Sequence, residues 1–120
     1  MEAAQFAVSV NSTEPEKLIA FYRDVVGLTP GPEAVPGAFM AGSASFFAFI
    51  IGDHSELNGA TKEPQRVMLN FIVSDLASEE ARLKEQNVEF IKSATKGNGV
   101  TMATFLDPDG NYCQLLQLGA

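Results

Sequence analysis

The feature of this sequence that most constrains its fold is an internal repeat of one pattern, a strand followed by a helix and further short strands. The apolar positions alternate over residues 5–10, the largely apolar run 67–73 is also typical of a strand, and a helical pattern follows each segment. Val10 and Val73 end the two opening strands, and their separation of 63 positions is about half of the 120-residue chain. A repeat of this length predicts two similar supersecondary units.

The first helix has start and stop signals. Thr13 can cap it, Pro15 falls in its first turn, and Glu16 completes the spacing of a capping box. Gly27 is placed to end it in a left-handed conformation. The apolar side chains between these signals are spaced as one helical stripe: Leu18, Phe21, Tyr22 and Val25.

The second half has comparable signals. Ser74 and Asp75 can cap a helix that runs to about Gln86, and Asn87 can end it. A hairpin turn is predicted at 97–99 and a type I turn at 107–110. The remaining segments that favour strands are 38–41 and 45–51 in the first half and 88–91, 100–105 and 112–118 in the second.

These elements predict an α+β fold with two tandem βαβββ modules and a cleft between two curved mixed sheets. Module one spans about 4–52 and module two about 66–119, within a single domain of 1–120. Residues 53–65 are polar, include Gly59 and Pro64, and show no apolar period, so they read as a linker.

Composition excludes several classes of function. The net charge of −7 and the pI near 4.5 leave no basic surface for nucleic acid. The longest apolar run, 46–51, is too short to cross a membrane. The N-terminus lacks the pattern of a secretory signal, and the single cysteine, Cys113, suits a reducing compartment. We therefore expect a cytoplasmic protein.

Four segments of the chain resemble motifs of the vicinal oxygen chelate superfamily, which includes glyoxalase I, extradiol dioxygenases, and fosfomycin- and bleomycin-resistance proteins. The segments lie in both halves and in the family's order. They read FYRDVVGL at 21–28, NFIVSDL at 70–76, ARLKEQNVEF at 81–90 and FLDPDGN at 105–111. The resemblance implies the same tandem βαβββ fold, which supports both enzymes and ligand-binding proteins.

Many enzymes of this superfamily bind a divalent metal between the modules. Aligning the two strand-ending valines puts Gln5 and Met68 at the opening-strand ligand positions, and the count from the DPDGN turn puts Gln114 at the last. Phe47 or Phe49 falls near the remaining position. Neutral amides and a thioether are poor ligands for zinc, nickel or iron. We therefore expect no metal and no other cofactor.

Two further residues have alternative readings. His54, the only histidine, is either a metal ligand or general base above the cleft or a solvated loop residue. Cys113 is either a reactive thiol or an inert packed side chain.

Strand alternation gives the candidate cleft a mostly apolar lining with a few polar anchors, which is typical of small-molecule sites. In the first module this places Phe47, Phe49 and Ile51 on the cleft face. The predicted ligand-binding residues are Gln5, Phe39, Phe47, Phe49, Met68, Asn70, Tyr112 and Gln114.

The first functional hypothesis is a metal-independent protein that binds a cationic or aromatic antibiotic or metabolite, as the superfamily's resistance proteins do. The second is an enzyme of the superfamily, glyoxalase-, lyase- or dioxygenase-like, with an atypical site that either depends on a metal or acts through general acid–base groups such as Tyr112, Asp109 or Glu89. No catalytic residues are assigned, because alternation places no carboxylate pair in the cleft. A dimerising interaction module is the third. By resemblance, we expect a homodimer with a small-molecule ligand.

Overall fold

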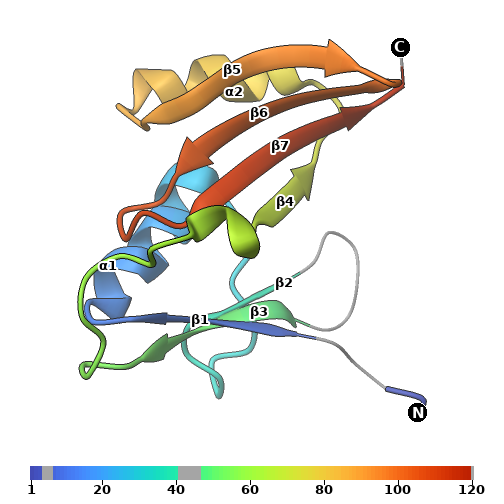
Figure 1. Ribbon diagram of the computed structural model, residues 1–120. Helices are drawn as coiled ribbons and strands as arrows, with labels where there is room; N and C mark the ends of the chain where they lie inside the picture. Colours follow the sequence, from blue (N-terminus) through green and yellow to red (C-terminus); the bar gives the residue numbers. More distant parts are fainter. Residues whose placement is uncertain (4–6, 41–46, 120) are drawn as a thin grey trace. The chain divides into compact units, whose positions relative to one another are not determined.

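The computed structural model describes residues 1–3, 7–40 and 47–119. Residue contacts divide the chain into two compact units, Met1–Asn58 and Gly59–Ala120. Each unit combines a mixed sheet with a helical segment that packs against it, so the predicted α+β fold with two βαβββ-like halves is confirmed (Figure 1).

The first unit has a three-stranded sheet in the order β1-β3-β2, in which β3 runs parallel to β1 and antiparallel to β2. Its helix widens into π-helical turns after its first six residues. The elements are β1 (Val8–Ser12), α1 (Pro15–Ala20), η1 (Phe21–Val26), β2 (Ala38–Met40) and β3 (Phe47–Asp53).

A rudimentary further strand borders β2. Pro30 forms an isolated antiparallel bridge with Phe39, and Met40 N donates to Thr29 O at 2.9 Å. Gly31 N also donates to Ala38 O at 2.8 Å, so the bonds of this pair come from the residues that flank Pro30, and the missing N–H of proline costs the bridge no hydrogen bond.

The predicted capping residue of the first helix, Thr13, is wrong. Glu14 is the N-cap, without a capping hydrogen bond from its side chain, and its backbone N donates to Ser12 Oγ at 2.9 Å. The cause is that β1 continues two residues beyond Val10, to Ser12, so the turn begins later than the sequence indicates. The predicted end is confirmed, because Gly27 has φ 87°.

The second unit has a four-stranded sheet in the order β4-β7-β6-β5, in which β4 is parallel to β7 and the other pairs are antiparallel. The edge strand β5 has two register irregularities against β6. The elements are η2 (Pro64–Arg66), β4 (Leu69–Ile72), α2 (Leu76–Glu85), β5 (Phe90–Gly97), β6 (Val100–Leu106) and β7 (Tyr112–Leu118).

The capping and turn residues predicted in the second half are confirmed. Asp75 caps α2 by accepting from Ser78 Oγ at 2.7 Å and from Ser78 N at 3.2 Å, and these hydrogen bonds lower the pKa of Asp75. Asn87 ends the helix region with φ 62°. Asn98 and Gly99, with φ 52° and 76°, form the turn between β5 and β6.

The DPDGN segment is held by one buried carboxylate. Asp107 Oδ1 accepts from the backbone N of Asp109 and of Asn111, both at 2.9 Å, and its Oδ2 accepts from Asn111 Nδ2 at 2.8 Å. Gly110 N donates to Asp107 O at 3.0 Å, which closes the predicted turn. These residues of the family motif therefore shape the chain before β7.

Each unit has its own aromatic core. In the first, the rings of Phe39 and Phe49 stack at 5.3 Å, and Tyr22 of η1 lies 5.2 Å from Phe49. In the second, Phe105 of β6 lies between Phe71 and Phe90, at 6.4 and 5.5 Å. Within the described residues, we find no helix with the length and apolar character of a membrane span.

Candidate functional site

Strand register corrects the alignment of the two halves. Val8 pairs with Phe49 and Leu69 with Cys113 in equivalent parallel ladders, and α1 and α2 begin at Pro15 and Leu76. The opening strands therefore correspond with an offset of 61 residues. The predicted offset of 63 is wrong, because Val10 lies inside β1 and does not end it.

The face of the second sheet opposite α2, here called the far face, carries several of the predicted residues. The α2 side is identified by Gln117, whose Oε1 accepts from Leu76 N at 2.7 Å. Side chains alternate along β7, so Tyr112, Gln114 and Leu116 lie on the far face.

A row of polar side chains crosses the far face, one from each strand. Gln114 Nε2 lies 3.3 Å from Thr104 Oγ1 and 3.9 Å from Met102 Sδ, and these contacts orient its amide. The register places the row at Asn70, Gln114, Thr104 and Lys92. Thr104 is 6% exposed, so the row offers the amides of Asn70 and Gln114 and the ammonium group of Lys92 for hydrogen bonding.

The next row along the far face is mainly apolar. Ile72 pairs with Leu116, and Leu116 with Met102. Ile72 is 67% exposed, and Leu118 at the end of β7 is 62% exposed. On this face, polar groups therefore lie next to apolar side chains whose burial against a ligand would be favourable.

The other predicted residues lie in different surroundings. Met68 is half-buried immediately before β4, and Tyr112 is half-buried and pairs with Leu106. Gln5 lies outside the described residues. Phe47 begins β3, where the structure describes only its backbone.

The predicted cleft-facing placement of Phe49 and Ile51 is wrong. They are 5% and 4% exposed, and Phe49 packs against Tyr22 of the helical segment. Phe39 is 1% exposed and occupies the position in β2 that Phe105 occupies in β6, each opposite an equivalent residue of the parallel-paired strand. The rings of Phe39 and Phe49 therefore form the core of the first unit.

Several other candidate groups are not members of the polar row. His54 is exposed, and its Nδ1 lies 2.8 Å from Glu56 Oε2, a hydrogen bond that lowers the pKa of Glu56. Cys113 is buried. Asp109 lies in the turn before β7, and Glu89 is exposed immediately before β5.

Sequence reasoning missed Met102, Thr104 and Lys92. The signal for the first two was available, since pairing 100–105 with 112–118 as a hairpin extends the alternation to a second strand. Lys92 had no such signal. An irregularity between Phe90 and Lys92 changes the face on which later side chains of β5 lie.

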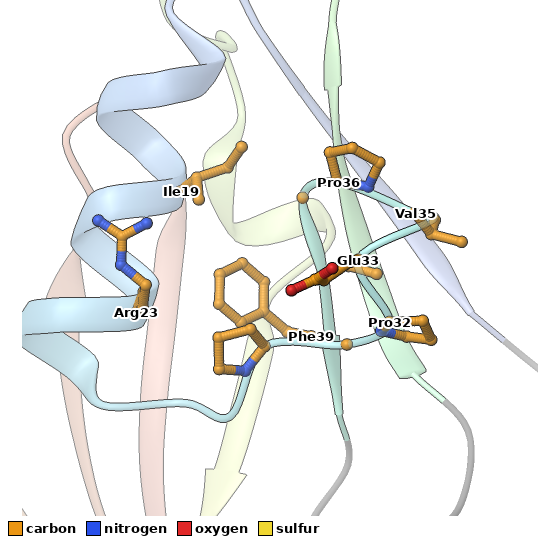
Figure 2. Close-up of a pocket in the computed structure, with 11 residues that line it drawn as sticks. Ile19, Arg23, Pro32, Glu33, Val35, Pro36 and Phe39 are labelled. Carbon is orange, nitrogen blue, oxygen red and sulfur yellow. The ribbon is translucent and has the colours of Figure 1, made fainter.

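A cavity of about 280 Å³ lies within the first unit, between the helical segment and the loop that leads to β2 (Figure 2). Ile19 and Arg23 line it from the helical side, and Glu33, Val35 and three prolines line it from the loop. The prolines are Pro30, Pro32 and Pro36.

The model of the glyoxalase-like domain family matches residues 7–116, which is most of the chain. This chain is a glyoxalase-like protein. It belongs to the vicinal oxygen chelate superfamily, as its four sequence motifs indicate. Among curated proteins, no match to this glyoxalase-like chain is found.

Solved structures share the fold of this glyoxalase-like chain. An antibiotic-binding protein, TnmS3 from Streptomyces sp. CB03234, is 24% identical with TM-score 0.74, and the alignment covers 99% of each chain. A member of the glyoxalase/bleomycin resistance protein/dioxygenase superfamily from Sphaerobacter thermophilus is 19% identical with TM-score 0.72, covering 96% of this chain and 98% of the other. A glyoxalase/bleomycin resistance protein from Streptomyces sp. CB03234 is 22% identical with TM-score 0.67, covering 93% and 98%.

The metal-ligand positions of the superfamily are poorly suited to a divalent cation in this glyoxalase-like chain. With the corrected register, Ala7 corresponds to Met68, and Ile50 to Gln114, so neither Gln5 nor Phe47 or Phe49 occupies the equivalent position. Two hydrocarbons, a thioether and an amide provide neither imidazole nor carboxylate. Within the ranges that the structure describes, no group of three His, Cys, Asp or Glu residues could hold a metal.

Proposed function

We propose that this chain is a metal-independent small-molecule-binding protein that sequesters an aromatic antibiotic or metabolite against the far face. The observation that carries the proposal is the polar row beside the apolar row on the second sheet. Small-molecule sites combine apolar area with a few fixed polar groups in this way. The similarity in fold to an antibiotic-binding protein, TnmS3, supports the same reading.

The charge of the far face favours an aromatic ligand over a cationic one. Lys92 is the charged member of the polar row, and it would repel an ammonium group. The amides of Asn70 and Gln114 instead suit the carbonyl or hydroxyl oxygens of a planar molecule. The chain's net charge of −7 therefore does not describe the local charge of this face.

Binding of 2-naphthol in the presence of a chelator tests the proposal. We expect saturable binding with perturbed NMR signals of Gln114 and Leu116, and weaker binding of 2-naphthylmethylammonium. Gln114→Ala should weaken 2-naphthol binding about 2- to 10-fold, the effect of losing one hydrogen bond. The control Gln65→Ala removes an exposed amide in η2 and should leave the affinity unchanged.

Elemental analysis of the purified protein tests whether it contains a metal. A stoichiometric transition metal together with metal-dependent turnover would contradict the binding proposal and favour an enzyme. Equal loss of affinity in Gln114→Ala and Gln65→Ala would show that the ligand does not contact the far face.

We further propose that the protein forms a homodimer in the cytoplasm. Exposed apolar side chains at Ile72, Leu118 and Val67 support self-association, because a second copy would remove them from water. The buried thiol of Cys113 is compatible with a reducing compartment. Sedimentation at micromolar concentration should give twice 12.8 kDa, whereas a mass of 12.8 kDa would contradict the dimer.

A further inference from the structure

The cavity of the first unit is not part of the far face, and it has its own shape and charge. We propose that it is a second binding site, selective for a small organic cation in which an ammonium group is joined to one ring. The supporting observations are its apolar walls, its hydrogen-bonded loop and the balance of charge at its rim.

The walls of the cavity are mostly hydrocarbon. Ile19, Val35 and Ala38 contribute aliphatic groups, and the three prolines contribute ring faces. The volume of about 280 Å³ is near the lower end for small-molecule pockets, so a single ring with a short chain matches it. Burying such a ring removes apolar area of both partners from water.

The loop that forms the cavity is held in place before any ligand arrives. Gly31 N donates to Ala38 O at 2.8 Å, and Val35 N donates to Pro32 O at 3.0 Å. Ile51 N of β3 donates to Gly37 O at 2.9 Å, which ties the loop to the sheet. Because proline rings also restrict the backbone, binding would cost little conformational entropy.

Two charged side chains line the cavity, and only one has its charge balanced nearby. Arg23 forms a two-point ion pair with Asp24, with Nε–Oδ1 at 2.8 Å and the terminal nitrogen at 2.9 Å from Oδ2, and this pairing raises the pKa of Arg23. Glu33 is exposed and has no ion pair within the described ranges.

The orientation of Glu33 determines which charge a bound ligand would meet. Figure 2 shows its carboxylate extending from the loop toward the helical side that carries Ile19 and Arg23. An ammonium group on a ring held by the apolar walls would therefore meet an unbalanced negative charge. An anion would have to compete with Asp24 for Arg23.

Three probes of similar shape test this site by NMR: phenethylammonium, phenethyl alcohol and 3-phenylpropionate. We expect the cation to bind most tightly and the anion most weakly, with the largest shifts at the amides of Gly31, Gly37 and Ala38. Tightest binding of 3-phenylpropionate would overturn the proposal, because Arg23 would then be the anchor. Shifts confined to residues of the second unit would overturn it as well.

Two matched variants distinguish the effect of the charge at the cavity rim on binding from the effect of the protein's net charge. Glu33→Gln should weaken phenethylammonium binding about 2- to 5-fold at low salt, as for a solvent-accessible ion pair, and should leave phenethyl alcohol binding unchanged. Glu85→Gln alters the net charge equally from an exposed position on α2 and should have no effect. Equal affinities for phenethylammonium in these two variants would contradict the proposal.

Discussion

Replacing Phe39 by alanine should lower the free energy of unfolding by about 3–5 kcal/mol, the usual cost of removing a fully buried aromatic side chain. Phe39 is 1% exposed and stacks on Phe49 at 5.3 Å, so its loss leaves a cavity beneath the helical segment. Equilibrium denaturation in urea measures the change.

A matched control for this variant is Leu57→Ala, which removes an apolar side chain that is 43% exposed and belongs neither to the far face nor to the side chains proposed for self-association. It should change the free energy of unfolding by less than about 0.5 kcal/mol. If Phe39→Ala kept its stability and instead lost ligand binding, the ring would be part of a ligand site and its assignment to the core would be wrong.

Replacing Gly37 by alanine should destabilise the protein more than the same change at Gly27. The two glycines have nearly the same backbone conformation, with φ of 86° and 87°. A Cβ at Gly37 would lie 2.7 Å from Ile51 O, whereas a Cβ at Gly27 would have no heavy atom within 4 Å among those described. Comparing the two variants therefore distinguishes the cost of a strained backbone from the cost of a steric clash.

For Gly27→Ala we expect a loss of about 1–2 kcal/mol, the cost of a left-handed conformation. For Gly37→Ala we expect about 2–4 kcal/mol, because the contact with Ile51 also disturbs the hydrogen bond from Ile51 N to Gly37 O. Thermal and urea unfolding of both variants measure these losses. Equal losses would mean that the loop moves away from β3 without cost.

Short-range features of the fold were predictable from the sequence because their causes are local. Gly27 and Asn87 end helical segments, and Asn98 with Gly99 turns a hairpin, since few other residues adopt positive φ without strain. Asp75 caps α2 through a residue three positions away. The resemblance to the superfamily then implied the tandem βαβββ fold as a whole.

Features that depend on pairing between distant strands were not predictable in the same way. The face on which Phe49 lies is set by the parallel ladder between β1 and β3, whose members are about 40 residues apart. An error of two residues at the end of β1 moved the alignment of the halves, and with it the candidate position Gln5. Gln114 was predicted on one face together with Asn70 by alternation counted forward from the DPDGN turn, and the two residues pair in the parallel ladder of β4 and β7.

The irregular edge of the second sheet limits how copies of this chain can associate. Strand β5 carries Lys92 and Lys96 and departs twice from regular register, so it is a poor template for hydrogen bonding to a strand of another molecule. Fibrous assembly by continuation of the sheet is disfavoured at this edge. Any specific dimer would therefore bury side-chain surfaces and would not extend the sheet through β5.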